Sequence, residues 1–241
     1  MNNIICMKWG TKFDSGYVNR LFKMVKANMT VPYRFVCFTD DGNGIDPNVE
    51  IFSIPPMLLD NNAPERGWRK LTIFKRKLFN LQGQALFLDL DIAIRANIDD
   101  FFNVEGDFLI IKDWDFPNDI IGNSSVFRFS IGSHSYVLEN FIKNSDAVKS
   151  NFRNEQAYLS HIIKERGNLK YWDKNWCVSF KRHCLNKWPI CYFKEPMEPL
   201  NAKIVVFHGR PNPQEACKGY VGKYGFRYVK PTTWLKKYVG S

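Results

Sequence analysis

The stretch Ala85-Leu86-Phe87-Leu88-Asp89-Leu90-Asp91-Ile92-Ala93-Ile94 places two carboxylates inside an apolar run. The run predicts a buried strand, in which side chains two residues apart point to the same face, so Asp89 and Asp91 would converge. Two like charges there repel each other and lose hydration unless a cation lies between them. The expected cation is Mg²⁺ or Mn²⁺, because both prefer oxygen ligands. The alternative is an ordinary strand end with two solvated carboxylates.

The 241-residue chain has the length of one domain, and its net charge is +10. Such a charge favours an anionic partner, for example a nucleotide, a phosphorylated lipid or a membrane surface. Nucleic acid is not expected, because no arginine-dense arm is present. The sequence shows no signal peptide and no apolar run near the roughly 20 residues that span a bilayer. We therefore expect a cytoplasmic protein, peripheral at most on the inner face of the cytoplasmic membrane.

Strand-like and helix-like segments alternate through the first half of the chain. Strands are predicted at 3–8, 33–39, 49–54, 85–94, 107–112, 125–129, 177–180, 190–193 and 203–207, and helices from about 14, at 70–81, 136–142 and 155–164. This order predicts an α/β fold, a Rossmann-like α/β/α sandwich with a mostly parallel central sheet. Ligands of such sheets bind beyond the carboxyl ends of the strands, so the loops after residues 8, 39 and 88 should meet in one crevice.

A second signal is Val205-Val206-Phe207-His208-Gly209-Arg210-Pro211, in which an apolar strand delivers a histidine into a turn. A neutral imidazole suits Mn²⁺ as a third ligand beside carboxylates, and the alternative is a histidine satisfied by hydrogen bonds in the turn. Gly209 would let a phosphate approach the backbone. Arg210 could give a diphosphate two charge-assisted hydrogen bonds.

Three further clusters allow both a functional and an ordinary interpretation. The cationic run Arg66-Gly67-Trp68-Arg69-Lys70 suits a diphosphate, and equally a solvated basic face. The polar groups Asn123-Ser124-Ser125 and Asn154-Glu155-Gln156 carry the amides, hydroxyls and carboxylate that recognise sugar hydroxyls. The same residue types are common in turns and helix caps.

The order of these segments resembles bacterial glycosyltransferases of the GT-A fold, closest in layout to glycosyltransferase family 8 and its relatives. The resemblance covers roughly residues 4–214 and also includes Lys8-Trp9-Gly10-Thr11 and residues 35–41, which end in Asp40-Asp41. Two motifs depart from the pattern of that family. Asn154-Glu155-Gln156 replaces its Gly-Asp-Gln, and the loop after His208 lacks its Gly-x-x-Lys-Pro-Trp.

The resemblance implies a nucleotide-sugar donor, usually a UDP-sugar, bound through Mn²⁺ or Mg²⁺, and a glycan or lipid-linked acceptor of bacterial surface polysaccharide synthesis. It implies metal ligation by Asp89, Asp91 and His208. Donor binding is implied for Lys8, Trp9, Gly10, Thr11, Asp40, Arg69, Lys70, Leu90, Asn123, Ser124, Gly209 and Arg210. The residues implied at the reacting centre are Asp91, Asn154, Glu155 and Gln156.

Transfer with retention, as in family 8, needs no dedicated base, because a donor phosphate oxygen could take the acceptor proton. Inversion would need a carboxylate base, for which Asp113, Asp115 and Glu155 are candidates. Two other functions stay open. A sugar nucleotidyltransferase also uses an aspartate-bound metal, and a non-enzymatic basic protein would bind polysaccharide or nucleic acid without one.

The domain boundary is expected near residue 217, with a single catalytic domain at 1–217 and a tail at 218–241. From Lys223 to Tyr238 the tail mixes Lys and Arg with Tyr, Phe and Trp. This mixture is typical of segments that dock on anionic membrane surfaces. A helix packed on the core explains it equally well.

Overall fold

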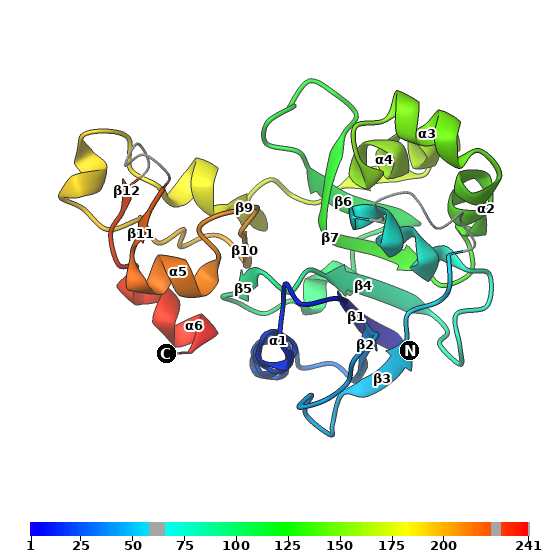
Figure 1. Ribbon diagram of the computed structural model, residues 1–241, viewed down its shortest axis with the longest axis horizontal. Coiled ribbons are helices and arrows are strands. Elements are labelled where there is room, and N and C mark those ends of the chain that lie inside the picture. The colour runs from blue at the N-terminus through cyan, green and yellow to red at the C-terminus, as the bar shows by residue number, and fades with distance from the viewer. Residues whose placement is uncertain (58–65, 223–227, 241) are drawn as a thin grey trace.

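The computed structural model describes residues 1–57, 66–222 and 228–240 (Figure 1). Its main sheet has seven strands, in the order β3 (Glu50–Ser53), β2 (Tyr33–Thr39), β1 (Asn2–Lys8), β4 (Gln84–Leu88), β7 (Gly122–Ser130), β6 (Phe108–Lys112) and β8 (Leu169–Tyr171). β7 runs antiparallel to its neighbours β4 and β6, and the other pairings are parallel. The mostly parallel α/β sheet expected from the sequence is confirmed.

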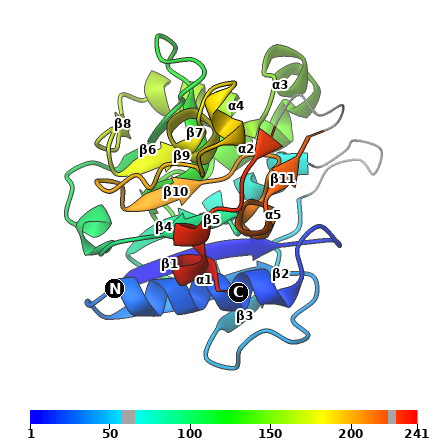
Figure 2. The same cartoon turned by 90° about the vertical axis from the view of Figure 1, so that its left-hand side faces the viewer.

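Alternate residues of the central strands supply the two cores, because successive side chains of a strand point to opposite faces. Ile4, Cys6 and Leu86 face α1 (Ser15–Asn28), whose apolar side has the expected helical spacing. Ile5, Met7 and Phe87 face the other core, with helices η1 (Arg66–Phe74), α2 (Ser135–Lys143), α3 (Ser145–Asn151) and α4 (Glu155–Glu165). Figure 2 shows α1 lying along the sheet.

A second, smaller group of elements forms a C-terminal lobe at one end of the molecule (Figure 1). Its strands are β5 (Ile92–Ile94), β10 (Ile204–Val206) and β9 (Cys177–Ser179) in one sheet, and β11 (Tyr220–Val221) and β12 (Tyr228–Val229) in another. Its short helices are η3 (Phe180–Cys184), η4 (Ile190–Tyr192), α5 (Pro213–Lys218), η6 (Thr233–Leu235) and α6 (Lys236–Val239), and η2 (Asp99–Phe102) follows β5.

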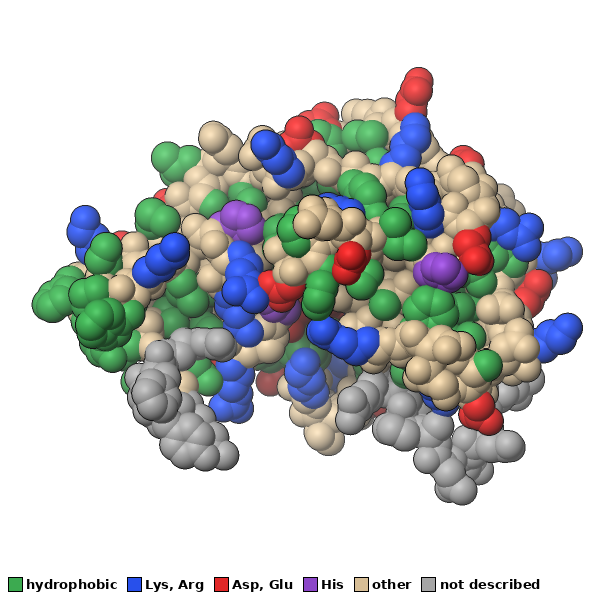
Figure 3. All heavy atoms as spheres, turned by 90° about the horizontal axis from the view of Figure 1, so that it is seen from above, with side chains coloured by type: hydrophobic (Ala, Val, Ile, Leu, Met, Phe, Trp, Pro, Cys, Tyr) green, Lys and Arg blue, Asp and Glu red, His purple; other side chains and the backbone are tan. Residues whose placement is uncertain are grey.

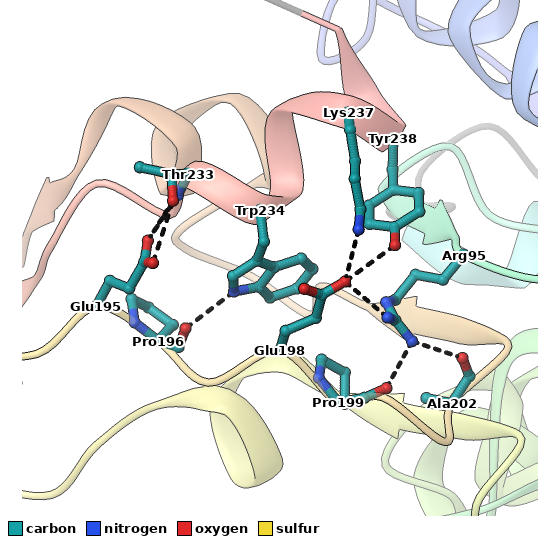
Figure 4. A network of polar contacts seen from close by, with 10 residues as sticks. All are labelled: Arg95, Glu195, Pro196, Glu198, Pro199, Ala202, Thr233, Trp234, Lys237 and Tyr238. Atoms are coloured by element: carbon teal, nitrogen blue, oxygen red, sulfur yellow. Dashed lines mark hydrogen bonds and ion pairs between the residues drawn. The ribbon is translucent and has the colours of Figure 1, made fainter.

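The described part of the expected tail packs against the rest of the chain. Trp234, Leu235 and Val239 are buried, and α6 contacts α1 and α5. A network of polar contacts holds the lobe and this tail together (Figure 4). Residues 223–227 and 241 of the expected tail lie outside the described residues. Within residues 1–57, 66–222 and 228–240, no helix has the length and apolarity to cross a membrane.

Three sequence-based predictions of local structure are wrong. The helix expected at 70–81 is the 3₁₀ helix η1 followed by a turn, and Lys70 of the basic run is buried together with Leu71 and Phe74. The strand expected at 190–193 is instead the short helix η4 (Ile190–Tyr192) at the surface, followed by Phe193. Asp89 and Asp91 lie in a turn rather than within one strand, because β5 leaves the main sheet to pair with β10.

Candidate active site

A cleft of about 420 Å³ opens at the carboxyl ends of the parallel neighbours β1 and β4. Its lining includes six residues for which the sequence predicts a role and four for which it predicts none. The first six are Trp9, Lys70, Asp89, Leu90, Asp91 and Glu155, and the others are Met7, Lys12, Phe13 and Gly67. The cleft therefore lies where ligands of open α/β sheets bind.

The turn that carries both aspartates joins the main sheet to the sheet of β5, β10 and β9. The backbone N–H of Asp89 donates to the Ser125 carbonyl on β7 at 2.9 Å, and the Asp91 carbonyl accepts from the N–H of Phe207 at 3.1 Å. Leu90 is buried in the core beneath the turn. The main sheet thus fixes the backbone of Asp89, and the C-terminal lobe fixes the backbone of Asp91.

The ammonium group of Lys70 neutralises part of the charge at this turn. Its Nζ lies 2.8 Å from Asp89 Oδ1, and it donates to the carbonyl and the Oγ of Ser124 at 3.1 and 3.2 Å. Burial alone would lower the pKa of Lys70, but the negative charges of Asp89 and Glu155 outweigh it and raise that pKa. A permanently charged cation therefore stands in the wall of the cleft.

Asp91 is electrostatically unfavourable in its charged form. Burial and then the negative charge of Asp89 raise the pKa of Asp91 to about 7, against the opposite effects of Lys12 and Lys70. A buried carboxylate in this condition gains most from a bound cation. Asp89 and Asp91 therefore suit a hard divalent cation, because both offer carboxylate oxygens and both line the same cleft.

A hydrogen-bonded chain leads from Lys70 to the N-terminus of α4. Ser124 Oγ donates to Glu155 Oε1 at 2.9 Å, and the N–H of Ser124 donates to Gln156 Oε1 at 3.3 Å. Gln156 Nε2 then donates to Asp113 Oδ2 at 3.2 Å. Asn154 caps α4 by accepting from the N–H of Ala157. The clusters Asn123-Ser124-Ser125 and Asn154-Glu155-Gln156 are thus joined by hydrogen bonds. Of the residues in these two clusters, Glu155 lines the cleft.

Gly67 explains how Glu155 reaches the cleft. A Cβ atom at this position would collide with both oxygens of the Glu155 carboxylate. Glycine therefore lets η1 pass close to the start of α4. The run Arg66-Gly67-Trp68-Arg69-Lys70 gave no signal for this contact, because a glycine next to basic residues also suits an ordinary loop.

The loop after β1 is tied to the loop after β2. Lys8 is buried, and its Nζ donates to the Asp41 carbonyl at 2.9 Å, while the N–H of Gly10 donates to Asp40 Oδ2 at 2.9 Å. Gly10 has φ +60°, a conformation that favours glycine. Lys8 is therefore placed to support the loop and does not line the cleft, whereas Trp9 does.

A second cavity, of about 410 Å³, lies at the ends of β2 and β3. Asp40 and Arg69 line it, together with Thr39, Ser53, Ile54, Pro55, Pro56 and Met57. Arg69 and Lys70 are adjacent residues that line different cavities. The basic run of η1 thus contributes one basic residue to the wall of each cavity.

The structure does not bring the three expected metal ligands together. His208 follows Phe207, whose N–H donates to the Asp91 carbonyl, so its backbone lies near Asp91. Its side chain has other partners, because Nε2 lies 2.7 Å from Ser179 Oγ and the ring stacks on Trp114. Burial and then the charge of Lys181 lower the pKa of His208, which favours the neutral imidazole. In residues 1–57, 66–222 and 228–240, no three His, Cys, Asp or Glu side chains form a metal-binding group.

The other residues expected to bind the donor lie outside the cleft lining. Gly209, with φ +77°, lies against Lys181, and Arg210 forms an ion pair of 3.5 Å with Glu215. Asn123 accepts a hydrogen bond from the N–H of Ser125 and is buried. Thr11 is exposed in the loop after β1. Lys12 and Phe13, the two residues that follow Thr11, line the cleft. They could have been predicted as binding residues because they continue the same loop.

Neither a protein-family model nor a curated protein matches the sequence. Solved structures match its fold. They include the galactosyltransferase LgtC in complex with donor and acceptor sugar analogues, at a TM-score of 0.62 and 12% identity over 88% of both chains. The glycosyltransferase GlyE of Streptococcus pneumoniae TIGR4 matches at a TM-score of 0.64 and 12% identity, over 88% of this chain and 56% of its own.

The bifunctional glycosyltransferase WbbM matches at a TM-score of 0.57 and 10% identity, over 87% of this chain and 46% of its own. The chain thus spans about half the length of GlyE and of WbbM, and most of LgtC. At these identities the likeness concerns the fold. The chain has the α/β fold of GT-A glycosyltransferases, with the Asp89–Asp91 turn and its cleft at the carboxyl edge of the sheet.

Proposed function

We propose that the protein is a metal-dependent glycosyltransferase that moves a sugar from a nucleotide-sugar donor, a UDP-sugar, to a glycan or lipid-linked acceptor in bacterial surface polysaccharide synthesis. The observation that carries the proposal is the Asp89–Asp91 pair beside the buried ammonium of Lys70, in a cleft at the carboxyl ends of β1 and β4. The fold shared with known glycosyltransferases supports it.

The two adjoining cavities support a nucleotide-diphosphate donor. We assign the nucleoside to the cavity lined by Asp40 and Arg69, and the diphosphate and sugar to the cleft lined by Trp9, Lys70 and Glu155. Because Arg69 and Lys70 are consecutive, one short segment offers positive charge to both cavities. Arg and Lys are the side chains that bind phosphate oxygens by charge-assisted hydrogen bonds.

Asp89 and Asp91 would hold Mn²⁺ or Mg²⁺, with His208, whose Nε2 pairs with Ser179 Oγ, as the proposed third ligand. When bound, the cation would stabilise the negative charge that develops on the leaving diphosphate. Lys70 stabilises the same charge from the wall of the cleft, because its ammonium is already oriented by Asp89 and Ser124. In the proposed reaction, this preorganised charge is the main contribution of the chain's own residues to stabilising the leaving diphosphate.

Transfer with retention of configuration agrees best with the positions of the carboxylates. An inverting enzyme needs a base close to the acceptor hydroxyl. Asp113 accepts hydrogen bonds from Gln156 and from the N–H of Asp115, and Asp115 pairs with Arg182 at 2.6 Å. Glu155 lines the cleft, but it accepts from Ser124 and its charge acts on Lys70. We assign Glu155 and Gln156 to orienting the sugar and Asn154 to holding the start of α4.

A donor screen tests the proposal. The protein is incubated with individual UDP-sugars and Mn²⁺, and the released UDP is measured with and without added acceptor glycans. We expect slow release with one or few donors, its loss on removal of the metal by chelation, and its loss in Asp91→Asn. Pyrophosphate formed from a nucleoside triphosphate and a sugar phosphate would instead identify a nucleotidyltransferase. Metal-independent, salt-sensitive polysaccharide binding without turnover would identify a binding protein.

A further inference from the structure

The C-terminal lobe carries an exposed apolar surface whose residues do not line the cleft. Trp188 is 78% exposed, Phe193 77% and Val221 62%, and Ile190 and Tyr192 are exposed by 48% and 44%. We call these five residues the lobe patch. Figure 3 shows hydrophobic side chains gathered at this end of the molecule. Side chains of this size are seldom exposed together in a soluble protein unless the surface has a partner.

The lobe patch is built on a fixed framework. The N–H groups of Tyr192 and Phe193 donate to the carbonyls of Pro189 and Ile190, which closes the turn of η4. The ring of Tyr192 stacks on Tyr228 at 5.0 Å, and Tyr228 pairs with Val221 across β11 and β12. The turn therefore projects its side chains outward from a two-stranded support, and is not a loose loop.

The charges around the lobe patch are predominantly basic. Lys187, Lys194 and Lys218 are exposed on the same or adjoining segments. The acidic residues of the segment are bound to the tail instead. Glu195 accepts from the N–H and the Oγ of Thr233, and Glu198 pairs with Arg95 and Lys237 (Figure 4). The lobe patch is thus an apolar surface bordered by lysines.

We propose that the lobe patch binds the protein to an anionic lipid surface, with Trp188 and Phe193 inserted at the level of the headgroups. Trp and Tyr are enriched at this depth of a bilayer, and lysines bordering them gain energy from anionic lipids. A protein partner fits less well, because protein interfaces are depleted of lysine. The membrane contact expected of the tail is thereby assigned mainly to residues 187–193, since Trp234, Leu235 and Val239 of the tail are buried.

Vesicle co-sedimentation tests the proposal with the full chain. Vesicles of phosphatidylcholine alone are compared with vesicles that also contain phosphatidylglycerol. We expect binding only to the anionic vesicles and a loss of at least about tenfold in affinity for Trp188→Ala/Phe193→Ala. Lys187→Glu/Lys194→Glu should lower affinity by about fivefold or more per lysine. The control Ile51→Ala/Ile120→Ala removes two apolar side chains outside the lobe patch that are 44% and 40% exposed, and it should bind as the unaltered protein does.

A second measurement tests insertion directly. Brominated lipids quench tryptophan fluorescence only when the indole enters the bilayer, so Trp188→Phe should lose most of the quenching while circular dichroism stays unchanged. Equal vesicle binding by Trp188→Ala/Phe193→Ala, or equal binding to neutral and anionic vesicles, would overturn the proposal. Dimerisation abolished by that double variant, without any vesicle binding, would show that the lobe patch joins two copies of the chain. Release of UDP from a soluble donor should be unaffected, which separates this proposal from the proposed transfer reaction.

Discussion

The cleft and the C-terminal lobe each contain a carboxylate surrounded by cations, yet the two carboxylates are affected in opposite directions. In the cleft, burial and Asp89 raise the pKa of Asp91 to about 7. In the lobe, hydrogen bonds from Arg95, Lys237 and Tyr238 lower the pKa of Glu198 to about 2 (Figure 4). The charged form of Asp91 therefore destabilises the folded state, whereas the charged form of Glu198 stabilises it.

This difference separates a site from a structural contact. The carboxylate of Glu198 is already satisfied by residues of the chain and needs nothing further. The carboxylate of Asp91 faces a cavity and gains from a cation supplied from outside. Groups kept in an unfavourable charge state inside a cavity are typical of functional sites. Substitutions in the two regions should accordingly divide into losses of activity and losses of stability.

Asp91→Asn should cause the largest loss of activity. We expect UDP release from the donor to fall by roughly a thousandfold, because the proposed cation loses a charged ligand. The free energy of unfolding should stay equal or rise, since a buried charge is removed. Thermal unfolding without metal measures the second effect. Low activity together with a strongly lowered melting temperature would place Asp91 with the structural carboxylates instead.

Lys70→Ala should have the next largest effect. Removing the ammonium should lower kcat/KM by roughly a hundredfold, because negative charge on the diphosphate is left without one of its preorganised partners. The same change should strengthen Mn²⁺ binding, since the divalent ion no longer competes with Lys70 for Asp89. Calorimetric titration with Mn²⁺ measures this. Lys77→Ala, an exposed lysine beyond η1, is the control and should change neither quantity.

Glu198→Gln should act on stability alone. It weakens the contacts with Arg95, Lys237 and Tyr238 and should cost about 2 kcal/mol of unfolding free energy. Because the folded-state pKa is lowered, the stabilisation is present above the unfolded pKa of about 4.3. It is lost as the pH falls from there toward 2. Denaturant unfolding of both proteins from pH 7 to pH 3 should therefore show converging stabilities.

The control for this comparison is Glu165→Gln. Glu165 is largely exposed and pairs with His161 at 3.1 Å. Its substitution should leave unfolding nearly unchanged across the same pH range. If Glu198→Gln also lowered UDP release at a temperature where it is fully folded, the division between the two regions would not hold.

Asn212→Ala should have the smallest of these effects. Asn212 and Glu215 form a capping box at the start of α5, and loss of the cap should cost about 1 kcal/mol. Asn154 also caps its helix, α4, by accepting from the N–H of Ala157, without a capping box. Asn154→Ala should therefore cost a similar amount of stability and in addition reduce activity, because Glu155 and Gln156 follow it directly. Comparing the two variants by thermal melting and UDP release separates the stabilising role of a helix cap from its effect on activity.

Much of the fold could be predicted from local pattern, because the strands are continuous apolar runs and α1 and α4 have regular helical spacing. The bend at Asp89 could not, since it depends on β5 pairing with β10 more than a hundred residues later. The same applies to Lys70, whose burial against Asp89 brings together two segments with no local signal for each other. His208 was expected beside the aspartates, but Ser179 and Trp114 hold its ring elsewhere, and neither was singled out in the sequence.

The most direct measurement is calorimetric titration of UDP into the protein with and without Mn²⁺, for the unaltered chain and for Asp91→Asn. We expect binding that requires Mn²⁺ in the unaltered chain and is lost in Asp91→Asn while Glu198→Gln retains it. Metal-independent binding of equal strength in all three proteins would contradict the assignment of the Asp89–Asp91 turn to a nucleotide-sugar site.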